Sequence, residues 1–249
     1  MEFVILFIAL HKGDSTMGFK PRKKQNLTQS VSNTPEKIFE AFKSRRDERG
    51  WNISDKVMDN LLGLIPLLKA RMEYQKVSEV VIAALIPPPE GSSMGALQYS
   101  FEEFWSWIES TQNGNVFRHP GIKTDSDHLS FLNGYSRVGL GQAGWLTVNL
   151  NGAEHRYLRK RPGFSVGLEF LALAAQCPQK VLAMDGGKDN PYWNLAGLNL
   201  FMPDTFSSGS ECSPSLSVLN GKVSLLYNHH SAPYHSPGGW VSPEFNIKR

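Results

Sequence analysis

The sequence predicts an α+β fold in which N-terminal helices precede an antiparallel or mixed sheet. Three observations lead to this prediction. Apolar residues in the first third of the chain recur at helical spacing, the segments around Asn151-Gly152 and Asn220-Gly221 alternate as strands do beside a turn, and no internal repeat is visible. The 249 residues suffice for one large domain with a buried core.

Composition excludes several classes of protein. Hydrophobic residues make up 41% of the chain and charged residues 20%, and the mean hydropathy is -0.30, which argues against a disordered, collagen-like, coiled-coil or multi-span membrane protein. The formal net charge of +3 is well below the positive excess of a typical nucleic-acid-binding domain. Cys177 and Cys212 lack C-x-x-C spacing, which favours reduced thiols in a soluble, cytoplasmic protein, with one bridge between them left open.

A basic segment is expected to precede the folded domain. Residues 1–34 are predicted to be disordered, and residues 35–249 to form a single α+β domain. The basic run at residues 20–24 favours a solvated tail, with a non-specific polyanion contact as the alternative.

The first residues carry an apolar run that is too short to cross a membrane. Residues 3–10 cover about half of the length that spans a bilayer, and they lack the flanking charge and cleavage site of a secretory signal. The codons for Lys12-Gly13 can form a purine-rich sequence of the kind that binds the ribosome shortly before a start codon. We therefore expect translation to start at Met17 and residues 1–16 to be an untranslated leader.

Two helices are expected at the start of the domain. Thr34 as N-cap and Pro35 at the first helical position predict a helix that ends near Gly50. Ser54 caps a second, longer helix, which Pro66 should kink because its ring removes one backbone hydrogen bond. The apolar face of this second helix carries Val57, Leu61, Ile65, Leu68 and Met72.

A buried strand and an aromatic helix follow. Residues 77–86 are mostly apolar, begin with β-branched side chains and end at three prolines, which favours a buried strand. Ser100 and Glu103 have the spacing of a capping box, which predicts a helix at about 101–111. Trp107 lies off the apolar face of this helix, and we expect another element to cover it.

Two hairpins are predicted in the second half of the chain. Asn151-Gly152 is expected to form the turn of a hairpin at residues 145–159, and Asn220-Gly221 that of a hairpin at residues 216–227, because Asn-Gly is the strongest two-residue hairpin signal.

A second apolar helix is predicted between the hairpins. Ser165 resembles the N-cap of a helix at about 166–176, and Pro178 should end it. Residues 180–184 favour a short strand.

Four segments of the second half occur in a recognisable order. They are residues 134–136, the strand that ends at residues 150–152, the helix at 164–176 and the closing hairpin with Trp240. Over about residues 130–245, this order of elements resembles an uncharacterised bacterial family, a domain of unknown function. The resemblance implies a soluble bacterial protein with no assigned activity.

The sharpest enzyme hypothesis is a hydrolase. Residues 163–167 fit the G-x-S-x-G pattern, in which Ser165 would be the nucleophile, and Asp185 and three histidines follow in the order Ser, Asp, His. The preceding segment is basic and ends at Pro162, unlike the buried strand that feeds such a turn, so we interpret Ser165 as an N-cap.

Three histidines near the C-terminus are candidate catalytic residues or metal ligands. His229, His230 and His235 follow a predicted strand, with Cys212 or Asp185 as further donors. Their spacing matches no established metal signature, and adjacent strand residues face opposite ways. We therefore expect no metal, no cofactor and, on balance, no enzyme.

A basic cluster around Tyr157 is a candidate site for nucleic acid or another polyanion. Strand alternation would divide its charges between two faces, which favours a solvated strand end instead. The residues are Arg156, Arg159, Lys160 and Arg161.

Aromatic and polar residues gather in loops predicted at residues 185–199 and 228–241. Large rings in such loops favour a ligand surface, with rings that plug the ends of a small sheet core as the alternative. We expect no membrane contact. The sequence therefore predicts a binding or interaction module for a small molecule or a protein, with a hydrolase as the alternative and a weak polyanion binder third. The candidate ligand-binding residues are Tyr192, Trp193, Asn194, His230, Tyr234, His235 and Trp240.

Overall fold

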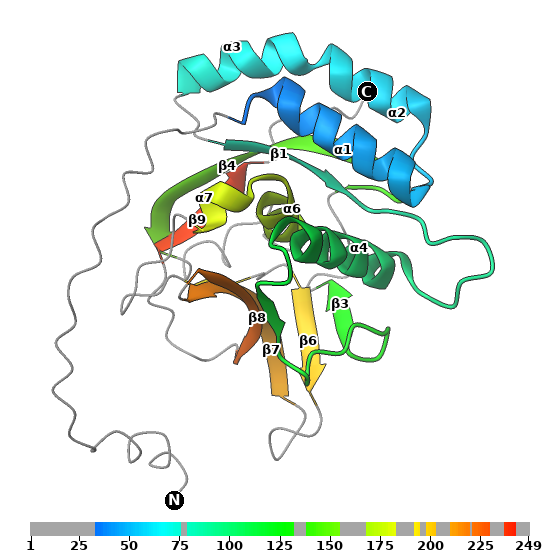
Figure 1. Cartoon of the computed structure of the whole chain (residues 1–249), viewed down its shortest axis with the longest axis vertical. Coiled ribbons are helices and arrows are strands. Elements are labelled where there is room, and N and C mark those ends of the chain that lie inside the picture. The colour runs from blue at the N-terminus through cyan, green and yellow to red at the C-terminus, as the bar shows by residue number, and fades with distance from the viewer. Residues whose placement is uncertain are drawn as a thin grey trace, which may run out of the picture. The chain divides into compact units, whose positions relative to one another are not determined.

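The chain combines helices with two small sheets, which confirms the predicted α+β class (Figure 1). It divides into two compact units, Met1–Ser32 and Asn33–Arg249, and all described residues belong to the second. The computed structural model describes residues 33–75, 79–131, 138–154, 168–182, 192–194, 198–202, 210–219, 221–229 and 237–242.

The first helix has the predicted boundaries. In α1 (Pro35–Arg49), the Thr34 hydroxyl accepts a hydrogen bond from the Lys37 amide N–H at 3.4 Å. Gly50 ends the helix with φ = 62°, a left-handed conformation that glycine adopts without strain.

The predicted kink at Pro66 is a break between two helices. α2 (Asp55–Gly63) begins after the Ser54 cap, as expected, and α3 (Ile65–Gln75) follows after Leu64. Pro66 thus lies in the first turn of a new helix. Backbone N–H groups in a first turn have no acceptor within the helix, so proline, which lacks this group, loses no hydrogen bond there.

The smaller sheet has the order β1-β4-β9 and contains the predicted buried strand. β1 (Glu79–Ala84) is an edge strand, and its residues 80–84 are at most 2% exposed. The Gln176 side chain closes the free edge of β1. Its Nε2 donates to the Ile82 carbonyl at 2.7 Å, and its Oε1 accepts from the Ile82 amide N–H at 2.9 Å.

The predicted hairpin at residues 145–159 was wrong. Asn151-Gly152 lies inside the continuous strand β4 (Ala143–Glu154), which pairs on one side with β1 and on the other with β9 (Pro237–Ser242). The β4–β9 register shifts between Asn149 and Ala153, so the dipeptide occupies an irregularity within the strand rather than a turn. Pairing with a distant strand overrides the local turn preference.

The aromatic helix α4 (Ala96–Thr111) begins earlier than predicted, and Gly95 is its N-cap. Ser100 lies inside the helix, where its hydroxyl donates to the Ala96 carbonyl at 2.7 Å. The same oxygen accepts from the Ile86 amide N–H at 2.7 Å. The capping-box prediction was therefore wrong. Instead, the Ser100 hydroxyl joins α4 to Ile86, which lies two residues beyond the end of β1.

The second apolar helix forms, but Pro178 does not mark the end of helical structure. α6 (Leu168–Gln176) is followed at once by α7 (Pro178–Leu182), in which Pro178 is the first residue. The predicted strand at 180–184 was wrong over the residues described, because proline at the first helical position favours a new helical turn.

The larger sheet has the order β2-β8-β7-β6-β3, with β5 also paired to β7. The predicted hairpin at 216–227 is confirmed, with Leu216 opposite Leu225 and Val218 opposite Val223. The strands are β2 (Val116–Arg118), β3 (Leu129–Phe131), β5 (Tyr192–Asn194), β6 (Leu198–Met202), β7 (Ser210–Leu219) and β8 (Lys222–His229).

The core lies around α4 and α6, between the two sheets. α1 and α2 contact the smaller sheet, α6 contacts β1 and α4, and α4 contacts β3 (Figure 1). Trp107 is 7% exposed, so it is covered as predicted. Cys177 and Cys212 are both buried and are not joined by a disulfide bond, which answers the open question of a bridge. Within the described part of the chain, no helix has the length and apolar character that crossing a bilayer requires.

Candidate functional site

The structure places four of the predicted ligand residues on strands rather than in loops. Tyr192, Trp193 and Asn194 form β5, which pairs with β7, and Trp240 lies in β9, opposite Asn149 of β4. The prediction that these four residues lie in loops was wrong, because they pair as strands with β7 and β4. β5 contacts β9, so the two segments lie together although they are far apart in sequence.

Most of the remaining candidates lie outside the described residues. His229 is described only as the last residue of β8, opposite Cys212. The candidates outside the described part of the chain are Arg156, Arg159, Lys160, Arg161, Ser165, Asp185, His230, Tyr234 and His235.

The register of β5 assigns its residues to two faces of the larger sheet. Trp193 is aligned with Leu216, which is wholly buried in the core. Because successive strand residues face opposite ways, Tyr192 and Asn194 lie on the other face, which we call the outer face.

The outer face is rich in residues that carry hydroxyl and amide groups. β7 shows the pattern most clearly, because Ser213, Ser215 and Ser217 alternate with the core residues Leu216 and Val218. By register and alternation, the outer face comprises Phe117, Ser130, Tyr192, Asn194, Asn199, Phe201, Glu211, Ser213, Ser215, Ser217, Leu219, Lys222, Ser224, Leu226 and Asn228.

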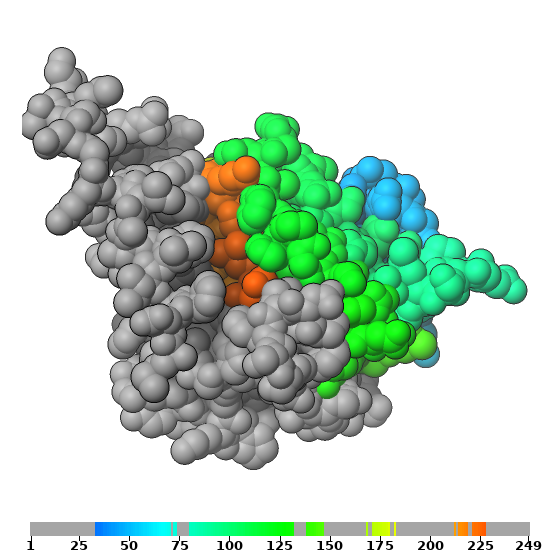
Figure 2. All heavy atoms as spheres, turned by 90° about the horizontal axis from the view of Figure 1, so that it is seen from below, coloured from blue at the N-terminus to red at the C-terminus, as the bar shows by residue number. Residues whose placement is uncertain are grey.

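Burial on the outer face decreases from β7 towards β2. Ser215 and Ser217 are 0% and 3% exposed, Ser224 and Leu226 on β8 are half-buried, and Phe117 on β2 is 40% exposed. Figure 2 shows described residues of β7 and β8, in orange, at the surface beside the green segments of the middle of the chain. The face is therefore buried at Ser215 and Ser217 and exposed at Phe117.

Ser215 is the exceptional residue of this face. Its hydroxyl oxygen is buried and has no hydrogen-bond partner among the residues that the structure describes. A buried hydroxyl without a partner destabilises the folded chain, so each such group calls for a physical explanation. Sequence reasoning missed Ser215, although the alternation of serine with apolar residues at 213–218 is a signal that could have indicated a polar strand face.

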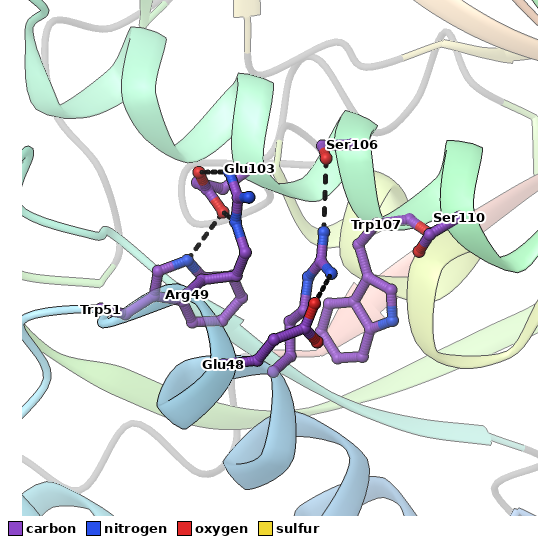
Figure 3. Close-up of polar contacts among 8 residues, drawn as sticks. Glu48, Arg49, Trp51, Glu103, Ser106, Trp107 and Ser110 are labelled. Carbon is purple, nitrogen blue, oxygen red and sulfur yellow. Dashed lines mark hydrogen bonds and ion pairs between the residues drawn. The ribbon is translucent and has the colours of Figure 1, made fainter.

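A second polar group joins α1 to α4 and has a structural role (Figure 3). The Glu103 carboxylate accepts hydrogen bonds from Arg49 Nη2 at 2.8 Å, Arg49 Nε at 3.0 Å and Trp51 Nε1 at 2.8 Å. Burial alone would raise the pKa of Glu103, but these hydrogen bonds outweigh it and hold the pKa below its ordinary value. Because both carboxylate oxygens are engaged, Glu103 is poorly suited to proton transfer.

Arg45 of α1 makes a second side-chain contact with α4. Its Nη1 donates to Glu48 at 3.2 Å and its Nη2 donates to Ser106 at 3.3 Å, whereas its buried Nε has no partner among the described residues. The Arg45–Ser106 and Arg49–Glu103 hydrogen bonds join α1 to α4, and neither of them provides a reactive group.

Two histidines lie in the loop between β2 and β3. His128 Nδ1 lies 2.6 Å from Asp125 Oδ1, and this hydrogen bond lowers the pKa of Asp125. His119 Nδ1 accepts from the Gly121 amide N–H at 3.1 Å, and its ring packs edge-on against Tyr227 at 4.9 Å between centroids. These contacts fix the conformation of the loop.

The described residues offer no metal site, and the Cys212 thiol is not activated. Within that part of the chain, no three His, Cys, Asp or Glu side chains are placed to hold a metal ion. Burial raises the pKa of the Cys212 thiol, which keeps it protonated and unreactive at neutral pH.

Comparison with known proteins assigns the chain to no class. No family model matches it, and neither a curated protein nor a solved structure matches it significantly. The resemblance to an uncharacterised bacterial family therefore stays a prediction. Among the described residues, the outer face is the candidate surface for function.

Proposed function

We propose that the chain is a binding protein whose ligand contacts the outer face of the larger sheet. The observation that carries the proposal is the buried Ser215 hydroxyl without a partner among the described residues. Leaving such a group unpaired costs about 1–3 kcal/mol. Because Ser215 is 0% exposed, a ligand would recover part of this free energy only by displacing the residues that cover the hydroxyl.

Two further features support recognition of a ligand. The outer face combines aromatic residues with hydroxyl and amide side chains, which donate and accept hydrogen bonds without changing charge. The contact between β5 and β9 also brings the segment that contains Trp240 next to Tyr192 and Asn194. The sequence predicts all three as ligand-binding residues.

The cellular setting is part of the proposal. A cytoplasmic location is supported by the two unbridged cysteines, since disulfides are rare in that compartment. A bacterial origin is supported only by the resemblance over residues 130–245.

A thermal-shift panel tests the proposed function. Neutral saccharides, nucleosides, amino acids, carboxylates and phosphate esters are added to the wild-type chain, to Ser215→Ala and to the control Ser44→Ala, whose serine is exposed on α1. A ligand at 100 times its Kd stabilises a protein by about 2.7 kcal/mol, or roughly 5–10 °C in Tm for a domain of this size.

We expect one class of compound to raise the Tm of the wild-type chain and of Ser44→Ala, and to have a much smaller effect on Ser215→Ala. No shift with any class would overturn the proposal. A shift that Ser215→Ala leaves unchanged would also overturn it, because the ligand would then bind elsewhere.

A further inference from the structure

Helices α2 and α3 lie end to end and share one helical periodicity (Figure 1). Leu64, the residue between them, has φ = −85° and ψ = −12°, a right-handed helical conformation. Its amide N–H donates to the Asn60 carbonyl at 3.2 Å, and its carbonyl accepts from the Leu68 amide N–H at 2.9 Å. These i to i−4 hydrogen bonds continue the helical turn through the junction, so residues 55–75 have one buried and one exposed face.

The exposed face of this segment is apolar at its centre. Leu62 and Leu67 are 50% and 55% exposed, and Gly63, Pro66 and Ala70 are exposed with them. Single exposed apolar residues are ordinary on a protein surface, whereas a group of them on one face indicates a contact with another molecule. The opposite side packs into the core through Val57, Met58, Leu61, Ile65 and Leu68, each at most 7% exposed.

Charged residues lie towards the two ends of the exposed face. Lys56 and Asp59 lie on α2, and Glu73 lies on α3, all of them exposed. We call the whole surface the α2–α3 face. It comprises Lys56, Asp59, Leu62, Gly63, Pro66, Leu67, Ala70 and Glu73.

The α2–α3 face is complementary to a second copy of itself that runs antiparallel. A two-fold axis between Leu64 and Ile65, directed outwards from the exposed side, places Leu62 of each copy opposite Leu67 of the other. The members of this pair lie equally far from the axis, both along the helix and around it, because a helix advances by about 100° and 1.5 Å per residue. The symmetry repeats the contact, so four leucine side chains lose exposure to water together.

The same axis matches the charges at the ends of the face. It places Lys56 of each copy opposite Glu73 of the other, which gives two ion pairs of opposite charge. At the centre, Gly63 lies opposite Pro66, and glycine has no side chain to hold the two helices apart. Asp59 lies opposite Ala70 and gains no charged partner.

We propose that the chain forms a two-fold dimer in which the α2–α3 faces of two copies pack antiparallel. This inference goes beyond the proposed ligand binding and does not depend on it. The segment is roughly 30 Å long, and a single helix pair of that length gives an interface at the low end of the usual size range. We therefore expect a weak dimer that dissociates on dilution.

Sedimentation equilibrium of the full chain, from low micromolar to millimolar concentration, tests the inference. The variants are Leu67→Ala, the single charge reversals Lys56→Glu and Glu73→Lys, and the double reversal that combines them. Lys123→Glu and Glu90→Lys are the matched controls, because they make the same changes of charge at exposed positions outside the α2–α3 face. Circular dichroism of each variant checks that the fold is retained.

We expect the wild-type chain and both controls to dimerise with the same Kd. Leu67→Ala should raise Kd at least about tenfold, because the leucine contact occurs twice in the dimer. Each single charge reversal should raise Kd several-fold, since it brings like charges together at both ends. The double reversal should restore the wild-type Kd, because it exchanges the two partners of each ion pair.

Three results would overturn the inference. A chain that stays monomeric at every concentration would show that the α2–α3 face has another occupant. A dimer that Leu67→Ala leaves unchanged would have its interface elsewhere. A double reversal that dimerises no better than the single reversals would exclude the antiparallel arrangement, because Lys56 and Glu73 would then not meet across the axis.

Discussion

Replacing Gln176 by methionine tests whether one side chain closes the edge of β1. Methionine has a similar length and flexibility but neither donor nor acceptor of comparable strength. The substitution leaves the amide N–H and the carbonyl of Ile82 unpaired, and Ile82 is 0% exposed. Each buried group left unsatisfied costs about 1–3 kcal/mol, so we expect a loss of about 2–6 kcal/mol in the free energy of unfolding.

Urea unfolding followed by tryptophan fluorescence and circular dichroism measures this loss. The midpoint should fall while the slope m stays the same, since the substitution changes stability rather than the surface that unfolding exposes. Gln112→Met is the matched control. Gln112 is 8% exposed, against 7% for Gln176, but its Nε2 has no partner among the described residues, so this change should cost little. Equal losses in the two variants would refute the reasoning.

Three further predictions concern buried polar groups. Urea unfolding should show Ser100→Ala destabilised by about 1–3 kcal/mol and Ser215→Ala unchanged or stabilised, because only the Ser100 hydroxyl has described partners. The pKa of Glu103 is lower in the folded chain than in the unfolded chain. Its contribution to the free energy of unfolding is therefore present at neutral pH and lost as pH falls below about 4.5. When stability is measured against pH, Glu103→Gln should lack this part of the acid-induced loss. Buried Cys177 and Cys212 should react with a thiol reagent only after unfolding, which rapid labelling of the native chain would contradict.

The two Asn-Gly dipeptides show how far local sequence determines this fold. Asn220-Gly221 separates strands whose residues pair with one another, from Leu219 opposite Lys222 to Cys212 opposite His229, so the turn and the pairing agree. Asn151-Gly152 has the same turn preference, but β4 pairs with β1 and β9 instead. These partners lie too far along the chain for a short window of sequence to indicate them.

The candidate site was predictable in its residue types and only partly in its position. Tyr192 and Asn194 were selected because polar and aromatic residues concentrate near them, and the register places both on the outer face. Trp193 was selected for the same reason, but the pairing with Leu216 assigns it to the core face. Local composition does not indicate that β5 pairs with β7 or in which register. This register decides which residues of β5 lie on the core face of the sheet and which lie on the outer face.

The smaller sheet joins three strands that lie far apart in the sequence. β1 begins at Glu79 and β9 ends at Ser242, with β4 hydrogen-bonded between them. During synthesis, β4 therefore waits until residues 237–242 have left the ribosome before its second edge is covered. Until then its 12 residues offer an open template for pairing with other nascent chains, which makes stop codons upstream of Pro237 a route to aggregation rather than to a shortened protein.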